Sequence, residues 1–240
     1  MSSKKNNVII LIFSVLVCMF MFAQNSWGLF SALYGEPGFR VSISYYGYQF
    51  WSFAMISSLL NLRFTSYLEQ YAACLVVRNN NRKAIYSHFQ KLIIKKTVLF
   101  EVWKCAIFSL GVLLFFGKIR FEDVLGGMMS FTDILFMIII FVLMEIMLLS
   151  IMMFLEVFVH QKFAWIFILS YFLISFWIGD ILIGTKVPDA YHLFFLPSLA
   201  MNYRLIDLDI APSMIIAVEL IVIIFTYFGG SIMITKKDIL

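Results

Sequence analysis

Apolar positions fall into six long runs separated by shorter polar stretches. A helix that crosses the hydrocarbon core of a bilayer needs about 20 residues at ~1.5 Å each, and the runs come close to that length. They cover residues 8–23, 45–62, 97–116, 134–155, 163–183 and 212–235. None shows the ten-residue alternation typical of a transmembrane barrel. The pattern therefore predicts an all-α polytopic membrane protein, with one six-helix domain over residues 1–240.

Composition excludes a soluble globule. Hydrophobic residues make up 62% of the chain and charged residues 13%, whereas soluble domains have about 45–50% and 25%. The formal net charge of +4 is too small for a nucleic-acid-binding protein. The first run follows Lys4 and Lys5 like a signal peptide, but no small-x-small cleavage site follows it. We therefore expect it to remain as the first span.

Basic residues are divided unequally between the two sets of loops and ends. Five belong to the set after spans one, three and five: Arg40, Lys118, Arg120, Lys186 and Arg204. Twelve belong to the other set: Lys4, Lys5, Arg63, Arg78, Arg82, Lys83, Lys91, Lys95, Lys96, Lys162, Lys236 and Lys237. By the positive-inside rule, this bias predicts that both termini are cytoplasmic.

Two connections are longer than a hairpin needs. Residues 63–96, on the cytoplasmic side, combine basic residues with apolar ones at near-helical spacing, which predicts helix. This segment either rests on anionic lipid head groups or docks a cytosolic partner. Residues 184–211, on the extracellular side, are too apolar for a free loop and are broken by Pro188 and Pro197. They predict a re-entrant segment of short helices dipping into the outer leaflet.

The chain lacks the common motifs of catalysis. It has no phosphate-binding loop, no H-E-x-x-H and no G-x-S-x-G, and its three cysteines are far apart in sequence. Glu156 and His160 are spaced i,i+4, with Glu145 three turns earlier, but the further ligands of a metal shell are missing. We expect no metal, no cofactor and no enzymatic activity in this chain.

Charged residues fall inside the predicted spans, among them Glu101, Lys104, Glu145 and Glu219. Glu101 and Lys104, at i,i+3, can neutralise each other. Glu145 and Glu219 have no cation nearby in sequence, and a charge at the centre of a span costs about 2.5–3.5 kcal/mol. These two are candidates for a translocation path. Each either lines a polar path for a substrate or, in protonated form, hydrogen-bonds another helix.

The segment that follows the second span resembles a known transporter family. Residues 69–75 read E-Q-Y-A-A-C-L, and Arg82 and Lys91 follow. This is similar to the E-x-E-x-G-T-L pattern, with later S-R and K, in permease subunits of ATP-binding-cassette (ABC) transporters of the type-2 exporter (ABC-2) class. Glu69, Leu75, Arg82 and Lys91 match that pattern, whereas Tyr71 replaces its second glutamate. The family usually has an amphipathic entry helix, and only seven residues precede the first span here.

The resemblance implies a non-catalytic subunit in a bacterial cytoplasmic membrane. Its partners would be a second permease, identical or different, and two cytosolic ATPases that hold ATP and magnesium. The substrate would be an amphipathic or antimicrobial peptide, moved in export or self-immunity. Residues of the coupling helix seated on the ATPase would be Glu69, Gln70, Tyr71, Leu75, Arg78, Arg82 and Lys83. The alternatives are an intramembrane metal-dependent protease or immunity protein, and a non-transporting membrane anchor.

Overall fold

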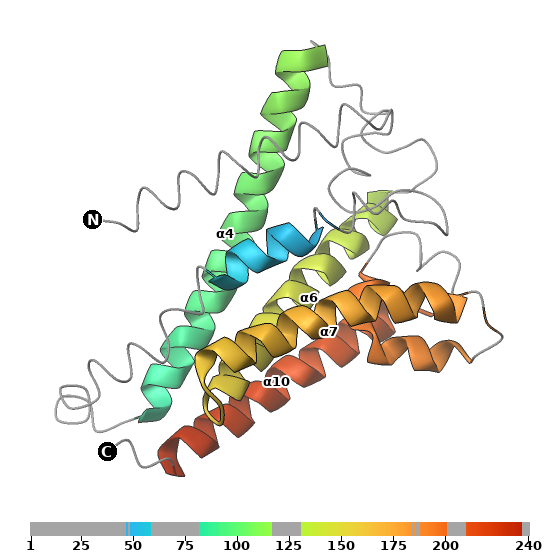
Figure 1. The fold of residues 1–240 in the computed structure, drawn as a ribbon. Coiled ribbons are helices and arrows are strands. Elements are labelled where there is room, and N and C mark those ends of the chain that lie inside the picture. Colours follow the sequence, from blue (N-terminus) through green and yellow to red (C-terminus); the bar gives the residue numbers. More distant parts are fainter. Residues whose placement is uncertain are drawn as a thin grey trace.

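The computed structural model describes residues 47, 49–58, 82–116, 131–183, 185, 188–200 and 210–236. In this part of the chain every regular element is a helix and no strand occurs (Figure 1), which confirms the all-α class. A short helix covers residues 49–58. The elements that follow it are α4 (Arg82–Phe116), α6 (Phe131–Glu156), α7 (Gln161–Ile183), η1 (Asp189–Phe194), α8 (Leu196–Leu199) and α10 (Pro212–Lys236).

Three of these helices are long and apolar enough to cross a membrane, so the chain is a membrane protein. They are α6 over Leu135–Glu156, α7 over Gln161–Gly179 and α10 over Pro212–Thr235. Their bounds agree with the predicted fourth, fifth and sixth spans to within a few residues. Pro212 occupies the first turn of α10, where its missing N–H leaves no helical hydrogen bond unmade.

Helix α4 is longer than the predicted third span. The predicted span ends with the helix at Phe116, but α4 begins at Arg82 rather than at residue 97 and has 35 residues, about 52 Å at ~1.5 Å per residue. The second half of the predicted cytoplasmic connection is thus continuous with the span. The sequence changes from basic to apolar at residue 97. The helix does not end there, and its backbone hydrogen bonds continue through this point.

The remaining predicted spans are tested only in small part. Residues 8–23 lie outside the described residues, and 45–62 are described at 47 and 49–58. Within that short helix, the Phe53 ring stacks on the Phe172 ring of α7, with centroids 5.0 Å apart. Trp165 Nε1 of α7 donates a hydrogen bond to Ser57 Oγ at 3.0 Å. The short helix is therefore fixed to one face of α7.

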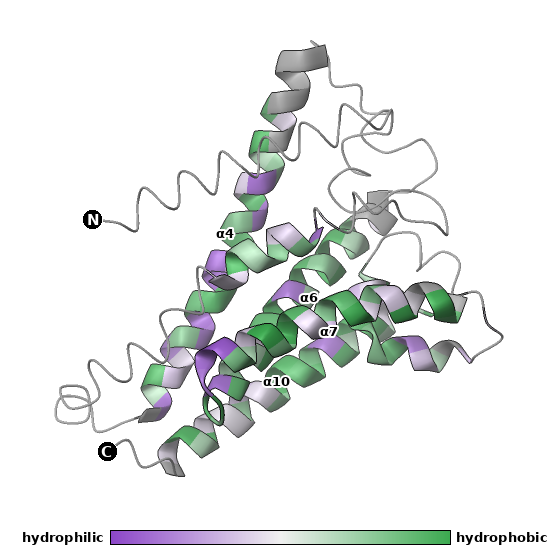
Figure 2. Ribbon diagram, in the orientation of Figure 1, coloured by the Kyte–Doolittle hydropathy of each residue, from purple (hydrophilic) through white to green (hydrophobic). Residues whose placement is uncertain are grey.

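Helix α6 lies at the centre of the bundle. It contacts α4, α7 and α10, and α4 and α10 also contact each other. In its most apolar stretch 61% of residues are buried, against 39% in α7 and 28% in α10. The apolar side chains of α6 are distributed all around the helix, as expected for a helix enclosed by others. In Figure 2, α6, α7 and α10 are mostly hydrophobic, whereas the first half of α4 alternates between hydrophilic and hydrophobic residues.

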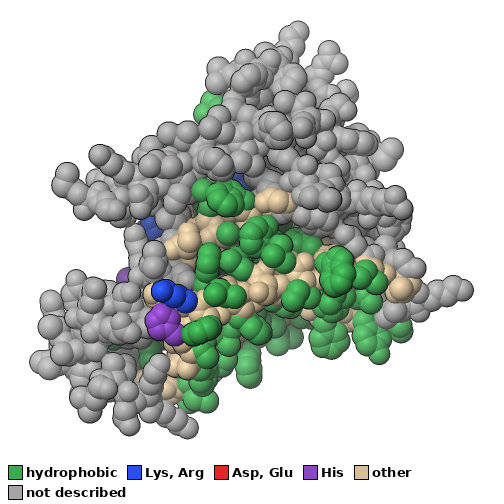
Figure 3. Space-filling view, in the orientation of Figure 1, with side chains coloured by type: hydrophobic (Ala, Val, Ile, Leu, Met, Phe, Trp, Pro, Cys, Tyr) green, Lys and Arg blue, Asp and Glu red, His purple; other side chains and the backbone are tan. Residues whose placement is uncertain are grey.

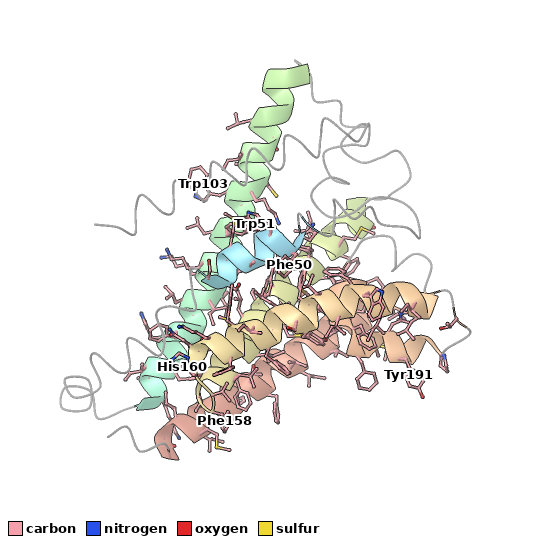
Figure 4. All side chains as sticks on the ribbon, viewed as in Figure 1. Phe50, Trp51, Trp103, Phe158, His160 and Tyr191 are labelled. Carbon is pink, nitrogen blue, oxygen red and sulfur yellow. The ribbon has the colours of Figure 1, made fainter. Side chains whose placement is uncertain are left out.

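One end of the bundle gathers the parts predicted to be cytoplasmic. The start of α4, the α6–α7 turn and the end of α10 lie together at the lower left of Figure 1. The turn follows α6 directly, with the Phe163 N–H donating to the His160 carbonyl at 2.9 Å. His160 and Phe158 are at this end and Tyr191 is at the opposite one (Figure 4). Lys162 on α7 and four lysines of α4 are exposed: Lys83, Lys91, Lys95 and Lys96.

Two short helices, η1 and α8, lie in the connection between α7 and α10. The Tyr171 hydroxyl of α7 donates to the Phe194 carbonyl at 2.8 Å, and the Ser198 N–H donates to Ser175 Oγ at 3.2 Å. All four residues of α8 are buried. The prediction of short helices in this connection is confirmed, and their entry into the outer leaflet stays a prediction.

The outer surfaces of α7 and α10 are apolar. Phe163 and Trp177 on α7 are each 69% exposed, and Phe225 on α10 is 68% exposed. Figure 3 shows hydrophobic side chains spread over the face that α7 presents. Side chains this large and apolar are compatible with lipid and not with water.

Candidate functional site

Helix α4 buries several polar side chains and exposes several large apolar ones. Buried polar residues recur every three to seven positions: Tyr86, Gln90, Thr97, Glu101 and Lys104. The opposite side exposes large apolar residues: Ile94, Val98, Leu99, Val102 and Trp103. Trp103 projects away from the bundle in Figure 4. This arrangement suits a helix with lipid outside and polar partners inside.

Two hydrogen bonds fasten the first half of α4. The Tyr86 hydroxyl donates to the Thr226 carbonyl of α10 at 3.0 Å, and Gln90 Nε2 donates to Ser150 Oγ of α6 at 2.6 Å. Burial, and secondarily the Glu156 carboxylate, raises the pKa of the Tyr86 hydroxyl well above its ordinary value. The hydroxyl therefore remains a donor at physiological pH.

Farther along α4, toward its C-terminus, the predicted pair of Glu101 and Lys104 is formed. Lys104 Nζ lies 2.5 Å from Glu101 Oε1, and both side chains are buried. The ammonium also sits 4.7 Å from the centroid of the Phe141 ring on α6, a cation–π contact. Lys104 is thus held between its own helix and α6.

Glu145 of α6 completes a cluster of three charged groups. It is one turn beyond Phe141 and 1% exposed, and its carboxyl interacts electrostatically with both Lys104 and Glu101. From the sequence, Glu145 has no local cation; in the fold, α4 supplies one. We name Glu101, Lys104 and Glu145 the charge cluster. Two carboxylates facing one ammonium leave one negative charge uncompensated.

Glu219 of α10 stands apart from this cluster. It is fully buried, and among the described residues neither of its carboxyl oxygens has a hydrogen-bond partner. Helices α6 and α10 run in the same direction (Figure 1), with Phe154 beside Phe225 and Gly229. Glu145 precedes Phe154 by nine residues on α6. It is therefore level with residues 216–220 of α10, which precede Phe225 and Gly229 by the same number. Glu145 and Glu219 are thus both buried, at one depth in the bundle but in separate surroundings.

The coupling residues are described only in part. Glu69, Gln70, Tyr71, Leu75 and Arg78 lie outside the described residues. Arg82 begins α4, and the Lys83 side chain is exposed on its first turn.

Glu156 and His160, although four residues apart, lie in different surroundings. Glu156 is buried near Tyr86, whereas His160 is exposed on the turn and its Nδ1 accepts the Lys162 N–H at 3.3 Å. Within the described ranges, no group of three histidine, cysteine, aspartate or glutamate residues could hold a metal ion.

Sequence reasoning missed the contacts that join α4 to its neighbours. Tyr86, Gln90, Ile93 and Thr97 are all buried and follow a spacing of four, three and four residues. That spacing is the mark of a helix seam. The lysines between these positions interrupt the apolar pattern, so the seam does not stand out in the sequence.

A family model described as a protein of unknown function (DUF2705) matches residues 7–240. The chain belongs to this family. Comparison with curated proteins and with solved structures gave no match. The family description names no activity.

Proposed function

We propose that this DUF2705 protein is the membrane-spanning, non-catalytic subunit of an ABC exporter of the type-2 class. It moves an amphipathic or antimicrobial peptide across the bacterial cytoplasmic membrane with ATP hydrolysed by a separate subunit. The observation that carries this proposal is the continuity of α4. One helix runs from Arg82, at the end of the coupling segment, to the charge cluster inside the bundle.

A rigid helix is what mechanical coupling to a cytosolic motor requires. A displacement of the first turn of α4 is transmitted along the helix, because its hydrogen-bonded backbone does not compress. Gln90 and Tyr86 join the helix to α6 and α10, so the displacement reaches both. An anchor protein would need no such link between its basic end and a buried charged site.

Support for the orientation comes from the exposed lysines. Lys83, Lys91, Lys95 and Lys96 on α4 and Lys162 on α7 lie toward the end where α4 starts and α10 finishes. We propose that this end is cytoplasmic, with six spans in all and both termini inside. The connection 184–211 is then extracellular and re-entrant.

In the assembled transporter, the segment Glu69–Arg82 seats on the ATPase and a second permease copy completes the pathway. Glu69 and Arg82 fix the register by charge-assisted hydrogen bonds, and the apolar residues between them fill a groove. Glu145 and Glu219 lie at the depth where a translocation path would need polar groups.

Charge reversal in the coupling segment tests the proposal. Glu69→Lys and Arg82→Glu, singly and together, are compared with Lys95→Glu, a reversal at an exposed site on α4. Each tagged variant is expressed from the chain's own locus, and recovery of an ABC ATPase with it is measured. We expect insertion in every variant and loss of the ATPase in the coupling variants only, because each reversed charge meets a like charge in the interface.

The lipid-surface alternative predicts a different pattern. It depends on total basic charge, so Lys95→Glu would weaken the contact of this segment with anionic head groups and Glu69→Lys would strengthen it, with the ATPase unaffected in both. Full recovery of the ATPase with the double coupling variant would exclude the coupling role.

A further inference from the structure

Helix α4 is joined to α6 at two points along its length. Gln90 Nε2 donates a hydrogen bond to Ser150 Oγ at 2.6 Å, and the Lys104 ammonium lies 4.7 Å from the centroid of the Phe141 ring. Both α6 residues belong to the stretch Leu135–Glu156, which is long and apolar enough to cross a membrane. Ser150 is six residues before the end of that stretch, about 9 Å along the helix axis. The part of α4 between the two contacts therefore runs alongside the interior of the α6 span.

Three lysines in this part of α4 have exposed side chains. They are Lys91, Lys95 and Lys96, and among the described residues none of them forms a salt bridge. A charged side chain that faces hydrocarbon at this depth is costly, and membrane proteins place such groups against polar partners, water or head groups drawn toward them. Hydrocarbon alone is therefore a poor neighbour for this side of α4.

The same face of α4 becomes apolar one turn farther along the helix. Lys91, Lys95, Leu99 and Trp103 follow one another at intervals of four residues, so they lie along one face. Leu99, Val102 and Trp103 are all exposed, and Trp103 projects away from the bundle (Figure 4). A ligand that contacts the whole face needs an anionic group at one end and a hydrocarbon part at the other.

We propose that this face of α4 binds an anionic phospholipid, with the phosphate on Lys91 and Lys95 and the acyl chains along the apolar residues from Leu99 to Trp103. A lysine ammonium binds a phosphate as a compact point charge. The head group is held beside the α6 span, below the ordinary level of head groups, so the bilayer is thinned locally on this side of α4. The site begins beyond Gln90 and leaves the segment Glu69–Arg82 available for the ATPase.

A second copy of the chain suits this face less well. The lysines would need carboxylates from the partner, but every acidic residue whose side chain the structure describes is buried: Glu101, Glu145, Glu156 and Glu219. A free phosphate ion would satisfy the lysines and leave the exposed apolar residues beyond them uncovered. The phospholipid satisfies both parts of the face with one molecule.

Quenching of Trp103 fluorescence by brominated acyl chains tests the proposal. The purified full-length chain is reconstituted in phosphatidylcholine vesicles that contain an equal small fraction of either brominated phosphatidylglycerol, which is anionic, or brominated phosphatidylcholine. Subtracting the quenching measured in Trp103→Phe isolates the contribution of Trp103 from those of the other tryptophans. The preference is the ratio of quenching by the anionic lipid to quenching by the zwitterionic one.

Four variants relate this preference to the lysines. Lys95→Gln and the double variant Lys91→Gln with Lys95→Gln remove charge from the site, and Lys95→Arg keeps it. Lys162→Gln is the matched control, because it removes one positive charge from an exposed position on the first turn of α7. The four substitutions are made both in the chain and in its Trp103→Phe form, and circular dichroism verifies that all are folded.

We expect the anionic lipid to quench Trp103 more strongly than the zwitterionic lipid does. Removal of one lysine should lower the preference about five-fold, since each lysine near a phosphate contributes about that factor to lipid affinity. The double variant should show little preference, and Lys95→Arg and Lys162→Gln should retain it.

Three results would overturn the proposal. Equal quenching by the two lipids would show that the lysines select no head group, and an equal loss in Lys162→Gln would show that only the total charge of the chain matters. Protection of Trp103 from both lipids would show that protein covers this face. No ATPase is present in these vesicles, so the outcome is independent of the transport proposal.

Discussion

The contact between Tyr86 and Gly230 gives the sharpest test of how α4 is held. Tyr86 is fully buried, and its hydroxyl donates to the Thr226 carbonyl of α10. A Cβ added at Gly230 would overlap the Tyr86 ring and hydroxyl. Only a residue without a side chain lets the two helices approach this closely. Gly230→Ala should therefore force apart the start of α4 and the end of α10.

The expected loss of stability follows from three terms. Overpacking in a core costs about 1–3 kcal/mol, and loss of one hydrogen bond costs about 0.5–1.5 kcal/mol. Alanine is favoured over glycine inside a helix by about 1 kcal/mol, which offsets part of this. The net loss is about 2 kcal/mol. For a chain of this length, that lowers the melting temperature by roughly 4–8 °C.

Gly229 provides a matched control on the same helix. A Cβ there would lie 3.1 Å from Cε2 of Phe154, a ring at the half-buried edge of the bundle that can move by a few tenths of an ångström. Gly229→Ala should be close to neutral. The melting temperature of each variant is measured in detergent from the change in tryptophan fluorescence on heating. The variants are Gly229→Ala, Gly230→Ala, Tyr86→Phe and the double variant of Tyr86→Phe and Gly230→Ala. Equal stability of the two alanine variants, or additive effects of Tyr86→Phe and Gly230→Ala, would refute the proposed overlap.

Two further predictions concern topology and the charge cluster. In a cysteine-free background, a single cysteine at Lys162 should be labelled only after the membrane is permeabilised, and one at Ala190 should be labelled from outside; the reverse pattern would exclude the proposed orientation. Lys104→Met should destabilise the chain by about 3–5 kcal/mol, because it leaves Glu101 and Glu145 without their ammonium. Adding Glu101→Gln and Glu145→Gln to that variant should restore most of the lost stability, and no recovery would indicate that the loss is one of packing.

The extents of α6, α7 and α10 were predictable because their apolar runs are long and uninterrupted. Hydropathy alone places such helices well, and their ends follow from features such as Pro212. The extent of α4 was not predictable in this way. Its first half carries Lys91, Lys95 and Lys96, whose exposure on one side of the helix lowers the mean hydropathy although Gln90 and Ile93 are buried.

The charge cluster was predictable only in its local part. Glu101 and Lys104 are three residues apart on one helix, so their pairing follows from helix geometry. Glu145 joins them only because α4 packs on α6 with Lys104 over Phe141. That register depends on side-chain packing between segments about 40 residues apart, which no local pattern encodes.

Whether this chain works with an ABC ATPase can be measured by purifying the chain from its native membrane. The chain is tagged at its own locus and purified in mild detergent, and ATP hydrolysis and polypeptide composition of the eluate are measured. We expect an ABC ATPase to be recovered in fixed ratio with the chain, and hydrolysis to disappear when the ATPase is dissociated, since the chain itself has no phosphate-binding loop. Recovery of a folded chain with no ATPase, or hydrolysis that stays with the chain alone, would contradict it.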